Sequence, residues 1–197
     1  MHRIWGVLVM AIFFACAANA QIARTATFEN YANGTDLPGS FTDSLSGITF
    51  RNSTHPPIGG FDIDSYSSYF SGGNYLTSGI IAPGGLGSYF GFTADLPTAA
   101  DSVSLDAIYH ADARSEVVLQ GFDSQGNLIA QEAGPPGLSQ SSFSLQITSD
   151  QYNITRIQVS VGGGFSGYDN IAYTYFPEPH ALFTLIPLTL PPHRRRR

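Results

Sequence analysis

Short runs in which hydrophobic and polar residues alternate dominate the middle of this chain, and no segment there keeps an apolar repeat of 3.6 residues. The alternation is cleanest at residues 102–107, 143–147 and 154–161. A period of two residues is typical of a strand with one buried face. Clusters of Gly, Pro, Asn, Asp and Ser separate the runs and mark turns. The pattern predicts an all-β fold, an antiparallel two-sheet sandwich of the jelly-roll type with about eight to ten strands.

The expected strands follow from these runs and turns. They cover residues 24–31, 47–51, 75–78, 88–93, 102–107, 116–122, 127–132, 143–147, 154–161 and 168–175. Residues 123–126 (Asp-Ser-Gln-Gly) lie between two of them and predict a β-hairpin. Residues 52–73 are rich in Gly, Ser, Pro and Tyr, and we expect them to form a long ordered loop. Such loops tend to be functional, so this segment is a candidate binding surface.

The N-terminus has the features of a secretory signal peptide. A positive n-region precedes an apolar run over residues 4–18, and Ala18 and Ala20 fit the small-x-small rule for cleavage. Cleavage after Ala20 would remove residues 1–20 and with them Cys16, the single cysteine of the chain. The mature protein is then expected to have no disulfide and no thiol chemistry.

The C-terminus consists of three parts in a fixed order. Pro177, Glu178 and Pro179 come first, an apolar run over residues 181–190 follows, and the chain closes with Arg194, Arg195, Arg196 and Arg197. The prolines favour an extended backbone, and the arginines favour the cytoplasmic side of a membrane. This order resembles the PEP-CTERM sorting signal of exported bacterial proteins. The resemblance implies an exosortase-type processing protease as a partner, and contact with the membrane only transiently, through the tail.

Residues 21–176 then form one β-sandwich domain between the signal peptide, 1–20, and the sorting tail, 177–197. The domain has four arginines and no lysine against fourteen of the chain's 15 acidic residues, so its net charge is about −10. Nucleic-acid binding requires Lys and Arg to neutralise phosphates, and we therefore exclude that class of partner. An acidic exported domain is compatible with Ca²⁺, whose ligands are oxygen atoms.

The two ends of the domain carry a second resemblance. Phe-Glu-Asn at residues 28–30 and Tyr-Asp-Asn-Ile at residues 168–171 resemble the ends of galactose-binding-like jelly rolls, which include many carbohydrate-binding modules. In many of these modules, acids and carbonyls of the first and last strands hold a structural Ca²⁺. The resemblance implies this role for Glu29 and Asp169. The alternative is that Glu29 is solvated and Asp169 takes part in turn or strand-edge chemistry.

Tyrosines in and near the long loop are candidate sugar contacts. An exposed aromatic ring offers a flat apolar face for stacking, and polar neighbours can bind sugar hydroxyls. The candidates are Tyr66, Tyr69, Tyr75 and Tyr89. Aromatic residues in sandwiches also serve as core or cross-strand partners, which is the alternative for each of them.

Two other sets of residues have the even spacing of a shared strand face. Asp106, His110 and Asp112 would share a face in one continuous strand and could bind a metal, although a hairpin turn there is the simpler interpretation. Asp62 and Asp64 lie in the expected loop and are either Ca²⁺ ligands or solvated acids.

The domain shows no recognisable catalytic motif. His55 and His110 are its two histidines, and neither belongs to a triad or zinc motif, while a glycosidase carboxylate pair would depend on separation in space. We expect a non-catalytic exported protein of the cell surface or extracellular matrix of a bacterium. The PEP-CTERM resemblance implies a link to exopolysaccharide and biofilm, which favours polysaccharide binding. The alternatives are a structural or adhesion matrix protein without glycan specificity, and a glycan-active hydrolase or lyase.

Overall fold

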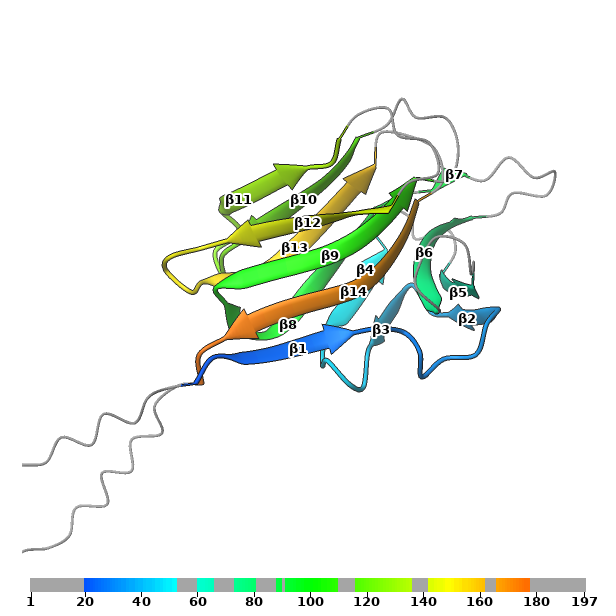
Figure 1. The fold of residues 1–197 in the computed structure, drawn as a ribbon, viewed down its shortest axis with the longest axis horizontal. Helices are drawn as coiled ribbons and strands as arrows, with labels where there is room; N and C mark the ends of the chain where they lie inside the picture. Colours follow the sequence, from blue (N-terminus) through cyan, green and yellow to red (C-terminus); the bar gives the residue numbers. More distant parts are fainter. Residues whose placement is uncertain are drawn as a thin grey trace, which may run out of the picture.

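The chain forms two antiparallel β-sheets that pack face to face in the computed structural model (Figure 1). The structure describes residues 20–52, 60–65, 73–80, 88–89, 91–109, 116–135, 142–161 and 166–177. These residues contain fourteen strands, more than expected, which form an eight-stranded sheet (sheet A) and a six-stranded sheet (sheet B). The predicted all-β antiparallel sandwich is therefore confirmed.

Sheet A contains the first and last strands of the domain side by side. Its main order is β12 (Ser142–Thr148), β9 (Ser102–Tyr109), β14 (Ser166–Tyr175), β6 (Asn74–Ile80), β5 (Phe61–Ser65) and β2 (Thr35–Leu37). In addition, β1 (Ile22–Ala26) pairs with β14, and β7 (Ser88–Tyr89) pairs with β6. Because Ile22 lies opposite Tyr175, both ends of the domain leave the sandwich at one place (Figure 1).

Sheet B lies behind sheet A in the view of Figure 1. Its order is β11 (Leu128–Ala133), β10 (Val117–Phe122), β13 (Ile154–Val161), β8 (Phe92–Ala100), β4 (Thr49–Asn52) and β3 (Ser40–Thr42). The β10–β11 hairpin is the predicted one. The Asp123 carboxylate accepts hydrogen bonds from the backbone N–H groups of Gln125 and Asn127, both at 2.9 Å, and Gly126 has a φ of 84°. Glycine adopts this left-handed conformation at no steric cost.

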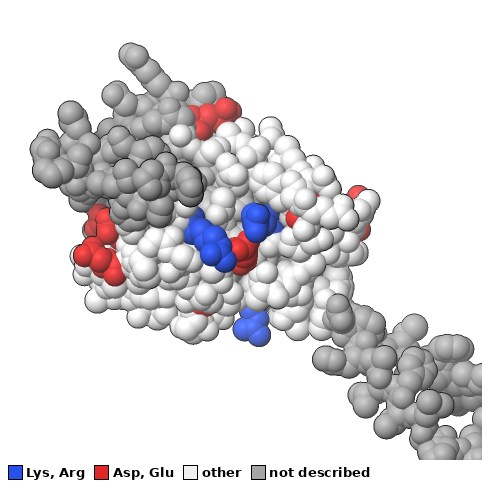
Figure 2. Space-filling view, turned by 180° about the vertical axis from the view of Figure 1, so that it is seen from behind, with Lys and Arg blue, Asp and Glu red and all other residues white. Residues whose placement is uncertain are grey.

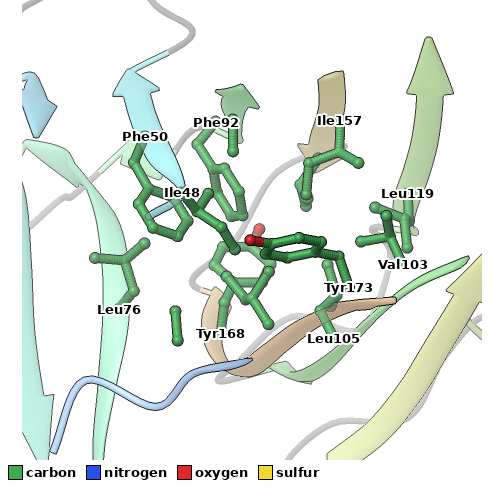
Figure 3. Close-up of a cluster of buried hydrophobic side chains, with 14 of the residues drawn as sticks. Ile48, Phe50, Leu76, Phe92, Val103, Leu105, Leu119, Ile157, Tyr168 and Tyr173 are labelled. Carbon is green, nitrogen blue, oxygen red and sulfur yellow. The ribbon is translucent and has the colours of Figure 1, made fainter. Parts of the chain in front are cut away.

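Apolar side chains from the inner faces of both sheets fill the core (Figure 3). Alternation along the strands produces this arrangement, since Ile157 and Val159 of β13 are fully buried while the residue between them is partly exposed. Aromatic rings cross from one sheet to the other. Phe92 of sheet B makes T-shaped contacts with Phe50 at 5.6 Å and with Tyr168 of sheet A at 5.1 Å. Such ring pairs add to the stabilisation that burial alone provides.

The segment expected to be one long loop contains strand β5. Phe61 and Ile63 are buried and the residues that follow each of them are partly exposed, which is a regular period of two. The prediction of a continuous loop over residues 52–73 is therefore wrong. The strand pattern is only five residues long and lies within Gly- and Ser-rich sequence, so composition concealed it. The flanking residues 53–59 and 66–72 lie outside the described part of the chain.

Candidate cation site on the outer face of sheet A

Two acidic residues face each other across strands β9 and β14. Asp106 lies directly opposite Asp169 in the pairing of these strands. Leu105 and Tyr168, which precede them, are buried between the sheets, so alternation places both carboxylates on the outer face of sheet A. Like charges directly opposite each other destabilise a sheet. The pair is therefore unfavourable unless its surroundings compensate for it.

Polar neighbours hold the two carboxylates in place. Asp106 accepts a hydrogen bond from Ser144 Oγ on β12 and another from Asn170 Nδ2 at 2.9 Å. Asp169 Oδ1 accepts a hydrogen bond from the backbone N–H of Asn170 at 2.7 Å. Asn170 has a φ of 49° and lies at an irregularity in the β9–β14 register, between Asp169 and Ala172. This irregularity brings the Asn170 amide to Asp106.

The turn after β1 brings Glu29 to the same region. The backbone turns at Phe28, which has a φ of 56°, and Tyr31 N–H donates to the Phe28 carbonyl at 3.1 Å. Glu29 Oε1 accepts a hydrogen bond from the backbone N–H of Asn74 in β6 at 3.0 Å. A Cβ atom on Gly73 would lie 1.5 Å from Glu29 Oε1, so the glycine leaves room for the carboxylate.

The surroundings of Asp169 oppose its negative charge. Asp169 is 6% exposed, and its pKa is raised to about 6. Burial is the main cause of the raised pKa; the hydrogen bond from Asn170 N–H lowers the pKa, and the charges of Glu29 and Asp106 raise it further. Glu29 and Asp106 are thus close enough to act on Asp169. We call these three residues the carboxylate cluster.

The carboxylate cluster offers oxygen donors of the kind that Ca²⁺ takes. This ion binds about six to eight oxygens, in mixtures of carboxylates, carbonyls, amides and water. A divalent cation would also offset the repulsion among the three carboxylates. No group of three or more Asp, Glu, His or Cys side chains within the described residues is arranged to hold a metal. A bound Ca²⁺ would therefore rest on Glu29 and Asp169, with its other ligands from carbonyl, amide or water oxygens, and its presence stays a prediction.

Asp106 is the member of the cluster that sequence reasoning missed. Spacing alone groups it with His110 and Asp112, and both of these lie outside the described residues. The pairing of β9 with β14 instead places Asp106 beside Asp169. Local spacing carries no signal for this contact, because it depends on the register between strands that are distant in sequence.

A second pair of acidic residues, Asp36 and Asp62, lies opposite each other near the edge of sheet A. Asp62 and Asp64 lie on β5, and Asp62 is opposite Asp36 of β2. Burial is the main cause of the raised pKa of Asp62; a hydrogen bond that its protonated carboxyl donates to Asp36, and the charges of Asp36 and Asp64, raise the pKa further. The role of Asp62 and Asp64 as Ca²⁺ ligands stays a prediction.

The predicted sugar contacts have different outcomes. Tyr75 is 0% exposed, so its ring is not available for stacking on a ligand and that prediction is wrong. Tyr75 precedes the core residue Leu76 in β6, so alternation places its ring on the outer face of sheet A, and there it is fully covered. Tyr89 lies in β7 at the margin of the sheet. Tyr66 and Tyr69 lie outside the described residues, and their roles stay predictions.

The predicted export signals lie almost entirely outside the described part of the chain. Ala20 and Pro177 are its first and last residues, so Ala18, Glu178, Pro179 and the four terminal arginines lie beyond it. Among the described residues, no helix is long and apolar enough to cross a membrane. Cleavage of the signal peptide, processing of the tail and the location of the protein stay predictions.

Comparison with known proteins defines the fold and leaves the family open. No protein-family model matches the chain, and no curated protein matches it by sequence. A cleaved adhesin domain of Lys-gingipain is similar, with a TM-score of 0.51 and 11% identity over 77% of this chain and 99% of that domain. A second such domain, from Porphyromonas gingivalis, has a TM-score of 0.46 and 14% identity over 79% and 99% of the two chains. The family 11 carbohydrate-binding module from Clostridium thermocellum has a TM-score of 0.41 and 16% identity over 77% and 94%.

Proposed function

We propose that this protein is an exported, non-catalytic β-sandwich that binds polysaccharide at the bacterial cell surface or in the extracellular matrix. One observation carries the proposal. Glu29 and Asp169 come from opposite ends of the domain, yet Glu29 accepts a hydrogen bond from Asn74 in β6, the strand that pairs with β14 next to Asp169, and its charge raises the pKa of Asp169. The resemblance to galactose-binding-like modules predicts that these two residues lie together and hold a structural Ca²⁺. Carboxylate oxygens such as theirs are ligands of the kind that Ca²⁺ takes.

The arrangement of the domain supports this function. Ile22 lies opposite Tyr175, so the segments leading to the N-terminal signal and the C-terminal tail leave the sandwich at one end. A chain held by its tail would present its outer faces and its other end to the surroundings. The fold alone does not decide the ligand, since sandwiches of this kind carry many functions.

The role of calcium in this proposal is structural. A Ca²⁺ held by Glu29 and Asp169 would join the turn after β1 to strand β14, because these residues lie on the two segments. It would neutralise the carboxylate cluster and stabilise the folded state over the unfolded chain. It would take no part in a reaction.

A second candidate function is adhesion or matrix assembly without glycan specificity. One observation favours it. Near the point where both ends leave the sandwich, Tyr152 is 50% exposed, Phe176 is 39% exposed and Ile22 is 36% exposed. The rings of Tyr152 and Phe176 contact each other at a centroid distance of 5.1 Å. Exposed apolar patches mark contact surfaces for proteins or membranes.

Affinity electrophoresis tests the proposed function. The mature chain is run, with Ca²⁺ present, through native gels that each contain one neutral or one acidic polysaccharide, beside a non-binding reference protein. Retardation in at least one gel, with the polysaccharide left intact, is the expected result. Unchanged migration in every gel, together with self-association in analytical ultracentrifugation, would instead favour a matrix protein. Shortening of a polysaccharide would show that the protein is an enzyme.

A further inference from the structure

A pocket of about 330 Å³ opens beside β1, at the edge of sheet A and away from the carboxylate cluster. Strands β1 and β14, the turn over residues 43–48 and strand β8 form its walls. Its lining includes Arg24, Tyr175, Ser44, Leu45, Pro97 and Thr98. The volume is at the lower end of the range for small-ligand pockets, about 300–1,000 Å³. A pocket of this volume can hold one monomer unit of a polymer, but not several units in a row.

The pocket is locally positive in an otherwise acidic domain. Arg51 and Arg156 both bind Asp95, at 2.9 and 2.7 Å, on the outer face of sheet B, so each of these two arginines has a carboxylate partner (Figure 2). Among the described residues, Arg24 has no carboxylate partner, and no acidic residue lines its pocket. A hydrogen bond with the Tyr175 side chain is the main cause of the raised pKa of Arg24. The guanidinium is thus exposed, charged and held beside a hydroxyl group.

One wall of the pocket is fixed before any ligand arrives. In the turn over residues 43–48, the buried Asp43 carboxylate accepts hydrogen bonds from Ser46 N–H at 2.8 Å and Ser46 Oγ at 2.7 Å. The Tyr173 hydroxyl donates to the Ser46 carbonyl at 2.9 Å, which joins the turn to β14. Gly47 has a φ of 77°, which closes the turn without steric cost. A fixed wall lowers the entropy lost when a ligand binds.

The remaining lining has the mixed character of a sugar site. Ser44, Thr98 and Tyr175 carry hydroxyl groups, which can donate to and accept from sugar hydroxyls. Leu45, 57% exposed, and Pro97 supply apolar surface for the C–H faces of a ring. Convergent polar groups on an apolar wall orient a small ligand.

We propose that the Arg24 pocket binds a carboxylate-bearing sugar, a uronic acid residue within an acidic polysaccharide. This inference rests on the proposed function and names its ligand class. A guanidinium binds a carboxylate through two parallel hydrogen bonds, a geometry that matches one uronate group. The hydroxyl groups and apolar wall around Arg24 then bind the ring that carries the carboxylate.

Isothermal titration calorimetry on the mature chain, with Ca²⁺ held constant, tests the inference. The probes are a trigalacturonate, a neutral galactotriose of the same length, and sodium acetate. Wild-type protein should bind the uronate about ten- to a hundredfold more tightly than the neutral sugar, as a charge-assisted hydrogen bond predicts. Arg24→Gln should remove this preference. Arg24→Lys should keep only part of it, because an ammonium cannot form the double hydrogen bond.

Arg156→Gln is the matched control, because Arg156 is also an exposed arginine but is bound to Asp95 on the opposite sheet. It should leave uronate affinity unchanged. Equal binding of both sugars, an unaffected Arg24→Gln variant, or equal binding of acetate would each overturn the inference. If a neutral polysaccharide still retards the protein in native gels, the proposed function stands without this pocket. Retardation by no polysaccharide, with no binding in the calorimeter, would overturn both.

Discussion

At the scale of single residues, Asp169 makes the stability of the fold depend on pH. Its ordinary pKa of 3.8 is raised to about 6 in the folded state, first by burial and then by Glu29 and Asp106. Between about pH 4 and pH 6 the folded protein therefore keeps a proton that the unfolded chain has released. Stability from this group is lost as the pH rises through that window, since the native state binds more protons there. At pH 7 an ionised Asp169 without a cation is destabilising.

Asp169→Asn should for this reason stabilise the protein in chelator. We expect the free energy of unfolding at pH 7 to rise by about 1–2 kcal/mol, less than the full shift would give because solvent screens part of it. The amide oxygen of Asn can still accept the hydrogen bond from Asn170 N–H. Urea unfolding at pH 7 and at pH 3.5 measures the effect, which should disappear at the lower pH.

Asp123→Asn is the control for that experiment. The pKa of Asp123 is lowered, chiefly by hydrogen bonds from the Asn127 side chain and backbone, so its ionised form is favoured in the folded state. This substitution should destabilise the protein at pH 7, opposite in sign to Asp169→Asn. Equal effects of the two variants on the free energy of unfolding would contradict the claim that the folded protein disfavours the ionised form of Asp169.

At the scale of elements, the turn over residues 43–48 is fixed to β14 by one buried hydrogen bond. The Tyr173 ring is 1% exposed, and its hydroxyl donates to the Ser46 carbonyl (ring in Figure 3). Tyr173→Phe should lower the free energy of unfolding by about 1–2 kcal/mol, because it leaves a buried carbonyl without this donor. Chemical denaturation measures the loss. Tyr152→Phe, at a half-exposed ring, should change stability by less than about 0.5 kcal/mol.

The approach of β6 to the turn after β1 gives a second prediction at this scale. An added Cβ at Gly73 would lie 1.5 Å from Glu29 Oε1, so Gly73→Ala should displace the Glu29 carboxylate without removing it. The rise in melting temperature caused by Ca²⁺ should then fall as far as in Glu29→Ala. Gly126→Asn is the control, since no atom lies within 4 Å of the added Cβ and Asn tolerates a φ of 84°. A full calcium response in Gly73→Ala would contradict the placement of Glu29.

At the scale of the whole molecule, local sequence patterns predict the strands, whereas both candidate sites are formed by residues that are far apart in the sequence. Residues 154–161 were predictable to the residue as β13, because their alternation is unbroken. The two-sheet fold followed from many such runs. Asp106 could not be assigned to the carboxylate cluster, because its neighbour depends on the β9–β14 register. The Arg24 pocket was likewise hidden, since its walls come from four separate parts of the chain.

The meeting of Glu29 and Asp169 is the feature on which the proposed function depends, and a cation there would be its clearest sign. Differential scanning calorimetry of the mature chain, in Ca²⁺ and in chelator, tests this most directly. A ligand at a hundredfold its Kd stabilises the native state by about 2.7 kcal/mol, so a rise of several degrees in melting temperature is expected. The rise should be lost in Glu29→Ala and in Asp169→Ala. Equal melting temperatures of the wild-type protein in Ca²⁺ and chelator would contradict the calcium site and the likeness to carbohydrate-binding modules built on it.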